Sequence, residues 1–297
     1  MLNIKTGNKV TNIKIVTISK ILVFLNCIII FFVYHNNSGI GIGMSILKRK
    51  IIDFIKRTNL IKSINFNKFV FYFLFNLKSQ FGQFKINIDQ KCLVLAQYPG
   101  AETKGLGGLI AQYPKNFEIL CLTNGSSLLS HLDSIESASI KKQQFQDVMR
   151  MTRVKGSKIF DIDNKTVKNH YSTFKKVDIS EVDYIFVPNV FDNNVDTIAL
   201  LKHFKQILKD KEFKPTLKIM MYESDFPLCT LDYYVDISSI IETKKKMLKV
   251  YYPEDKFPEY VDRLIGINSF RAIQHNKNYC EAFMCFSVDE FFRIPLI

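Results

Sequence analysis

The amino-acid sequence predicts an α/β fold, with a mainly parallel sheet flanked by helices and a hydrophobic, basic N-terminal extension before it. Three observations support this. Short apolar runs alternate with helical patterns over residues 87–297, two loops with unusual composition follow such runs, and the basic residues gather before residue 86. We therefore expect three parts, residues 1–43, 44–86 and 87–297, of which the last is the folded α/β domain.

The order of elements in the third part supports this fold class. Apolar, β-rich runs predict strands at residues 92–96, 117–122, 158–160, 184–187 and 217–221. Helical spacing of apolar residues predicts helices over 140–154, 198–208 and 240–250. Strands that alternate with helices are typical of parallel sheets with helices on their faces, so one such domain is expected.

Almost all of the net charge belongs to the N-terminal region. Residues 1–85 contain thirteen Lys or Arg and one acid, Asp53, while the whole chain carries +13. The rest of the chain therefore contributes only +1, and the basic balance says little about the α/β domain. Since no nucleic-acid-reading motif is visible, we predict no nucleic-acid partner.

Residues 15–34 form a twenty-residue apolar stretch interrupted by Lys20 and Asn26. A helix of this length, at about 1.5 Å per residue, spans roughly 30 Å of hydrocarbon, so residues 1–43 are predicted to hold an uncleaved transmembrane anchor. The larger basic cluster follows the stretch, which favours a cytoplasmic C-terminal domain. Met44 is an alternative start, and a chain that begins there lacks the anchor.

Residues 44–86 have a different pattern. Apolar residues between 46 and 55 alternate with basic ones at near-helical spacing, and the aromatic run FVFYFLF follows at 69–75. This pattern is typical of a helix that lies on an anionic membrane surface; the alternative is a pair of extra helices packed on the domain. We expect a membrane-associated protein whose membrane contact is made by this N-terminal region.

Two loops of the α/β domain bear on function. The first belongs to AQYPGAETKGLGGLIA, residues 96–111, and the second to VPNVFDNNVDTIA, residues 187–199. Each follows a predicted strand and leads into a helical pattern. Both loops are therefore expected at carboxyl ends of strands, where open α/β sheets bind their ligands.

Residues 91–297 resemble the PIG-L/LmbE family of GlcNAc-PI de-N-acetylase-like proteins, Rossmann-like zinc enzymes that remove the N-acetyl group from glucosamine-containing substrates. The family carries A-H-P-D-D-E with G-x-G-G, then L-T-N-G, then P with D-x-H-x-D-H, and a closing Y-A-E-A-F-like strand. The matching residues of this chain are, in order, Glu102, Gly105, Gly107, Gly108, Leu122, Thr123, Asn124, Gly125, Pro188, Asp192, Asp196, Tyr279, Glu281, Ala282 and Phe283. The resemblance implies a Rossmann-like sheet and a hydrolase ancestry.

The first motif departs from the family at the zinc site. The family's first ligand histidine falls on Tyr98, and its general-base and second ligand aspartates fall on Gly100 and Ala101. Only Pro99 and Glu102 keep the family's identity. A catalytic zinc needs about three ligands from Cys, His, Asp or Glu, which these positions do not supply.

The later motif departs in the same way. The histidine that assists the oxyanion falls on Asn194, and the last ligand histidine falls on Thr197. The histidines of the chain are scattered and its six cysteines show no C-x-x-C spacing, so no replacement metal site is expected. The alternative is a ligand supplied by His131 or His170 from a loop that folds over the pocket. The resemblance implies zinc, but the sequence predicts no metal and no other cofactor.

Each of these residues also has a purely structural interpretation. Glu102 lies near a predicted helix N-terminus, and a negative charge at that position stabilises the helix. Asn194 and Thr197 are residue types that open helices, and Asp192 and Asp196 fit surface-loop and cap positions. What favours a site is their convergence in one vestigial pocket, which is predicted to comprise Tyr98, Pro99, Gly100, Ala101, Glu102, Asp192, Asn194, Asp196 and Thr197.

The sequence thus predicts a deacetylase-like protein without a zinc site and without catalytic activity. Its predicted role is to bind a glycan or glycolipid, or a partner enzyme, in surface-polysaccharide metabolism. The alternative is an active deacetylase or other hydrolase, acting on the amide bond of an N-acetyl amino sugar, with unrecognised ligands or with chemistry built on Glu102, Asp192 and Asp196.

Overall fold

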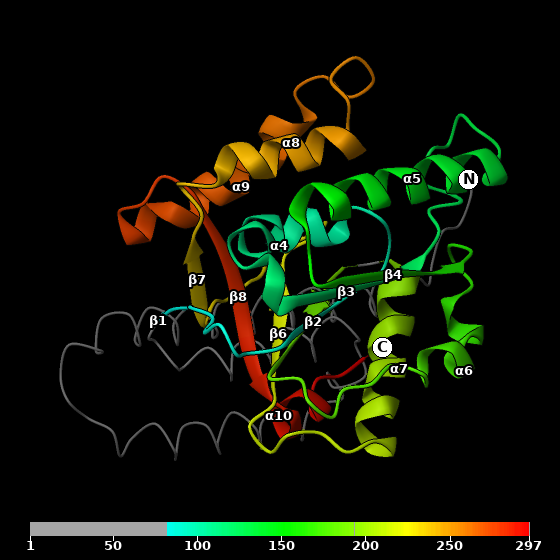
Figure 1. The fold of residues 1–297 in the computed structure, drawn as a ribbon, viewed down its shortest axis with the longest axis vertical. Coiled ribbons are helices and arrows are strands. Elements are labelled where there is room, and N and C mark those ends of the chain that lie inside the picture. Colours follow the sequence, from blue (N-terminus) through cyan, green and yellow to red (C-terminus); the bar gives the residue numbers. More distant parts are fainter. Residues whose placement is uncertain (1–81, 193, 297) are drawn as a thin grey trace, which may run out of the picture. The chain divides into compact units, whose positions relative to one another are not determined.

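The computed structural model describes residues 82–192 and 194–296, and in them a single mixed sheet of eight strands is the central element (Figure 1). In space the strands follow the order β1-β7-β8-β6-β5-β2-β3-β4. Their bounds are β1 Gly82–Gln83, β2 Cys92–Ala96, β3 Phe117–Thr123, β4 Gly156–Ile162, β5 Tyr184–Pro188, β6 Lys218–Tyr222, β7 Tyr233–Asp236 and β8 Cys280–Ser287.

The sheet is mainly parallel. Strands β2 to β6 pair parallel with their neighbours, with Val94 opposite Ile119 on one side and Phe186 on the other. The exception is β8, which lies antiparallel between β6 and β7. The five residues of β2 are all buried, as expected for a strand covered on both faces.

Helices cover both faces of the sheet (Figure 1). One face carries α4 (Ala101–Gln112), α5 (Ser134–Thr152), α8 (Ile241–Tyr251) and α9 (Tyr260–Ala272), and the other carries α6 (Tyr171–Phe174), α7 (Val195–Asp210) and α10 (Val288–Phe292). Short 3-10 turns are η2 (Pro114–Asn116), η3 (Val167–Asn169) and η4 (Ile273–His275). The faces bury separate apolar clusters, because alternate residues of each strand point to opposite sides.

The predicted α/β arrangement is confirmed, and the boundaries differ where local chemistry, not apolar spacing, sets them. Helix α5 begins at Ser134 instead of residue 140, because the Asp133 carboxylate accepts hydrogen bonds from the backbone N–H of Ile135 and Glu136. That first turn is polar or exposed and shows no apolar period. The strand expected at residues 158–160 runs over the whole of β4.

Helix α4 contains a break that an ion pair fills. Leu106 has non-helical angles (φ −143°, ψ 25°), which kink the helix at this residue. Glu281 accepts hydrogen bonds from the N–H groups of Gly108 and Leu109, both at 2.8 Å. The Lys244 ammonium donates to the Lys104 carbonyl at 2.8 Å and to Glu281 at 2.7 Å. The buried pair thus satisfies the backbone groups that the break leaves open.

The expectation for residues 1–43 and most of that for residues 44–86 fall outside the described residues, which begin at residue 82; residues 82 and 83 of the second segment form β1 of the sheet. All described residues lie within one compact unit of the chain, residues 63–297. In this part of the chain, no helix combines the length and the apolar character that a membrane crossing requires.

Candidate functional site at the carboxyl edge of the sheet

The carboxyl ends of β2, β5 and β6 meet at one edge of the sheet, and three loops leave it there. The loop after β2 carries Gln97 and Tyr98, the loop after β5 carries Asp192, and the loop after β6 carries Ser224 and Asp225. Parallel pairing places these three loops side by side. The position matches the edge where open α/β sheets bind ligands.

Glu102 fixes the start of α4. Its carboxylate accepts from the Gly100 N–H at 3.0 Å, the Thr103 hydroxyl at 2.8 Å and the Tyr251 hydroxyl at 2.9 Å. Burial raises the pKa of Glu102, and these donors oppose the rise. Gly100 has φ +105°, a conformation that favours glycine, and a Cβ there would lie 3.3 Å from the Tyr251 ring. Glu102 therefore holds the turn between β2 and α4.

A lysine ammonium lies at the centre of the edge. Lys104 Nζ donates to Asp225 Oδ1 at 2.7 Å and to the Tyr98 hydroxyl oxygen at 3.3 Å, and the Tyr98 hydroxyl donates to Asp225 Oδ2. The ammonium also lies 5.3 to 5.9 Å from the ring centres of Tyr98, Tyr252 and Tyr260. Carboxylate and ring faces both stabilise a cation, so this shell of groups fits the charged form of lysine.

The protonation states follow from these contacts. Burial disfavours the charged form of Lys104, but Tyr252 and Asp225 outweigh it and raise the pKa of Lys104 above its ordinary value. Burial and the Asp225 charge raise the pKa of the Tyr98 hydroxyl. Lys104 is therefore a permanent cation and Tyr98 a neutral donor at neutral pH.

A second network adjoins the first. Gln97 Nε2 donates to Asp192 Oδ2 at 3.1 Å and to Ser224 Oγ at 3.2 Å, and Ser224 Oγ donates to the same carboxylate oxygen at 3.1 Å. The Thr197 hydroxyl approaches that oxygen at 3.4 Å. Burial, followed by the charge of Asp225, raises the pKa of Asp192. Asp192 is the hub that links all three loops.

The remaining predicted residues have other positions. Asn194 caps α7 by accepting from the Asp196 N–H at 2.9 Å, and its own N–H donates to Asp192 Oδ1 at 3.1 Å. Asp196 accepts from the Lys165 N–H at 2.7 Å, which ties it to the loop after β4. Pro99 and Ala101 are buried. The structure thus brings Tyr98, Asp192 and Thr197 to this edge of the sheet and directs the Asp196 carboxylate to the loop after β4.

Four residues of this site were not predicted: Gln97, Lys104, Ser224 and Asp225. Asp225 and Ser224 had a usable signal, because they follow the strand predicted at 217–221 just as Asp192 follows an earlier one. Lys104 had a weaker signal, a lysine within an otherwise apolar, glycine-rich helix start. Its burial depends on a loop more than a hundred residues away, which local sequence does not reveal.

The donor set at this edge does not fit the zinc that the family resemblance implies. Gly100 and Ala101 offer no side-chain donor, and Asp225 is already paired with the Lys104 ammonium. Across residues 82–192 and 194–296, no group of three or more His, Cys, Asp or Glu side chains lies close enough together to hold a metal ion. We therefore derive no chemical step through zinc.

The fold is similar to that of several solved proteins. N,N'-diacetylchitobiose deacetylase from Pyrococcus horikoshii is similar with a TM-score of 0.56 and 18% identity, over 69% of this chain and 86% of that one. A conserved protein from Thermus thermophilus is similar with a TM-score of 0.53 and 16% identity, over 66% and 94% of the two chains.

A third similar structure belongs to an enzyme whose reaction is not deacetylation. It is GalB, the 4-carboxy-2-hydroxymuconate hydratase of Pseudomonas putida, with a TM-score of 0.53 and 13% identity over 67% of this chain and 96% of that one. No family model and no curated protein matches the sequence. Identities this low establish the fold alone, and function has to be argued from the site.

Proposed function

We propose that this protein is a zinc-independent, catalytically silent relative of the deacetylase-like proteins, and that its carboxyl-edge site binds a glycan or the sugar part of a glycolipid. The single observation that carries the proposal is the closed contact of Lys104 with Asp225 and Tyr98. Lys104 supplies the positive charge that neutralises the Asp225 carboxylate, so that carboxylate is not free to bind a metal ion.

Hydrolysis of an amide needs an activated water and a group that stabilises the oxyanion. The positions that the family uses for the base and a ligand are Gly100 and Ala101, which carry no functional group. Asp192, a carboxylate at the same edge of the sheet, accepts hydrogen bonds from Gln97, Ser224 and the Asn194 N–H. A carboxylate engaged in this way is suited to holding loops in place and poorly suited to taking a proton from water.

The rim of the site supports a sugar ligand. Tyr252, Phe257 and Tyr260 form an aromatic cluster, with ring centres 4.8 Å apart for Tyr252 and Tyr260 and 5.6 Å apart for Tyr252 and Phe257. These three residues are only partly buried. Partly exposed rings provide flat apolar surfaces, and the neighbouring Asp225 and Ser224 provide polar groups, a combination that suits the faces and hydroxyls of a sugar.

The test measures metal, reaction and binding on the same purified full chain. We expect substoichiometric zinc by mass spectrometry, no acetate release from N,N'-diacetylchitobiose, and saturable binding of that sugar by calorimetry or ligand-observed NMR. Tyr260→Ala should weaken binding at least tenfold, while Phe270→Ala, an exposed aromatic farther along α9, should leave it unchanged.

Two results would contradict the proposal. Stoichiometric zinc together with acetate release would show an active deacetylase with ligands of another kind. Equal sugar binding by Tyr260→Ala and Phe270→Ala would place the glycan away from the aromatic rim.

A further inference from the structure

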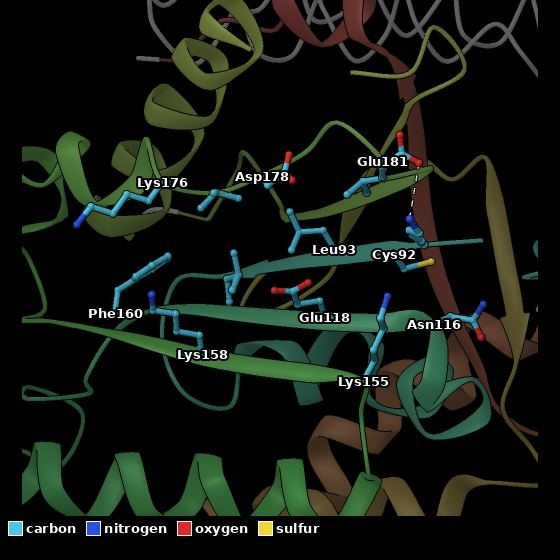
Figure 2. Close-up of a pocket in the computed structure, with 14 residues that line it drawn as sticks. Cys92, Leu93, Asn116, Glu118, Lys155, Lys158, Phe160, Lys176, Asp178 and Glu181 are labelled. Atoms are coloured by element: carbon cyan, nitrogen blue, oxygen red, sulfur yellow. Dashed lines mark ion pairs between the residues drawn. The ribbon is translucent and has the colours of Figure 1, made fainter. Parts of the chain in front are cut away.

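A cavity lies at the edge of the sheet opposite to the carboxyl-edge site. It has a volume of about 440 Å³ and is lined by residues at the amino ends of β2, β3 and β4 (Figure 2). Its apolar lining includes Leu93 and Leu120 of the strands and Val177 and Val182 of the segment before β5. None of these residues belongs to the carboxyl-edge site.

The cavity results from a short crossover. Between β4 and β5 the chain forms only η3 and the four-residue α6, where a parallel sheet commonly has a full helix. Phe174, at the end of α6, packs with Phe160 at a ring distance of 6.3 Å and with His203 at 5.9 Å. The packing of Phe174 covers the part of this sheet face near the carboxyl ends of the strands. Residues 175–183 cross the part near the amino ends without forming a helix.

On one wall of the cavity the charges are balanced. Lys91 pairs with Glu181 at 3.6 Å, and Lys214 approaches the same carboxylate at 4.0 Å (Figure 2). Hydrogen bonds from Ser180, with a smaller contribution from the charge of Lys211, lower the pKa of Asp178. Glu181 therefore has cationic partners, Asp178 accepts a hydrogen bond from the Ser180 N–H, and Lys176 also lines the cavity.

The facing wall carries excess positive charge. Lys155 and Lys158 of the β4 region lie on either side of Glu118 (Figure 2), and within the described residues neither ammonium pairs with a carboxylate. Lys158 Nζ lies 5.2 Å from the Phe160 ring centre.

We propose that this cavity binds the phosphate group of an amphipathic ligand, with the phosphate between Lys155 and Lys158 and the apolar part on Leu93 and Leu120. Two lysines that pair with no carboxylate among the described residues favour an anion, and the buried side chains of Leu93 and Leu120 favour an attached apolar chain. A soluble phosphate ester and a phospholipid headgroup share this chemistry. Glu118 lies close to the anion and weakens its binding.

The test uses hexyl phosphate, inorganic phosphate and hexanol as probes for calorimetry on the full chain. We expect hexyl phosphate to bind more tightly than inorganic phosphate, and hexanol not to bind. A charge about 6 Å away in water changes affinity about threefold, so the double variant Lys155→Gln/Lys158→Gln should weaken hexyl phosphate binding about tenfold. Glu118→Gln should strengthen hexyl phosphate binding about threefold, which is opposite in sign to the effect of the double variant.

The matched control is Lys246→Gln/Lys249→Gln, which removes the same charge from exposed positions on α8. It should leave hexyl phosphate binding within twofold of the unchanged chain. Vesicles that contain phosphatidic acid distinguish the two ligand sources. If the cavity binds a lipid headgroup, the Lys155→Gln/Lys158→Gln variant should bind these vesicles more weakly than the control variant does. If it binds a soluble ester, the two variants should bind vesicles equally, while Lys155→Gln/Lys158→Gln still binds hexyl phosphate more weakly.

The proposal is overturned if hexyl phosphate does not bind, or if the pocket and control variants bind it equally. Far-UV circular dichroism of each variant establishes that the sheet is intact. Glu118→Gln removes a charge without removing a lysine, so it tests the sign of the electrostatic effect independently of the double variant.

Discussion

Replacing Lys244 by methionine tests how the break in α4 is stabilised. Lys244 and Glu281 are 1% and 0% exposed, and the methionine keeps the apolar stem while removing the ammonium. Glu281 then remains buried without its cation, and the Lys104 carbonyl loses its donor. Breaking a buried pair by removing one partner costs about 3–5 kcal/mol of unfolding free energy.

The assay is urea unfolding followed by far-UV circular dichroism, because the chain has no tryptophan. The control is Lys245→Met on the same helix, whose partner Glu242 is 74% exposed. Such surface pairs contribute about 0–1 kcal/mol. If Lys244→Met is no more destabilising than Lys245→Met, the ion pair does not support the break and our reading of α4 is wrong.

Two further predictions concern glycine packing and pH. Gly105→Ala should lower the free energy of unfolding by more than about 2 kcal/mol, because its Cβ would lie 2.3 Å from the Tyr222 ring and 2.5 Å from the Glu223 carbonyl oxygen. In α9, the Cβ of Gly266→Ala would meet nothing within 4 Å, so this substitution should raise the free energy of unfolding by about 0.5–1 kcal/mol. Equal changes in melting temperature for Gly105→Ala and Gly266→Ala would contradict this prediction. Burial, with a smaller effect of Lys104, lowers the pKa of Lys141 from 10.5 to about 8. The unfolded chain then binds more protons at Lys141 between these values, so the contribution of Lys141 to the unfolding free energy should rise between pH 8 and 10.5 by up to about 3 kcal/mol. In urea titrations at pH 8 and 10, the unfolding free energy of Lys141→Met should therefore fall relative to that of the unchanged chain as the pH rises.

Much of the fold could be predicted because strands and helices leave periodic signals in the sequence. The five predicted strands correspond to β2 to β6, and the three predicted helices to α5, α7 and α8. The strands β1 and β7 were missed, since a two-residue and a four-residue strand carry little periodic information. The break at Leu106 was also missed, because Glu281 and Lys244, which stabilise it, lie far away in the sequence.

Part of the candidate site could also be predicted from the sequence. Motif spacing led to Tyr98, Asp192 and Thr197, which the structure brings to the same edge. It did not lead to Asp225, because that loop matches no motif and acts through a contact with Lys104. Loops that meet only in the folded state are where reasoning from one sequence loses information.

The place of β8 in the sheet has a consequence for how the domain assembles during synthesis. Of the described strands this one is made last, yet it lies between β6 and β7 and is, among those strands, the only connection of the β7-β1 pair to the rest of the sheet. Strands β2 to β6 can pair as soon as they are made, whereas β1, among the first residues described, must wait about 200 residues for its attachment. Until residue 287 is available, β6 keeps an unpaired edge, and a nascent chain is exposed there to wrong pairing with other strands. Chaperone dependence or stalling should therefore concentrate on synthesis of this last strand.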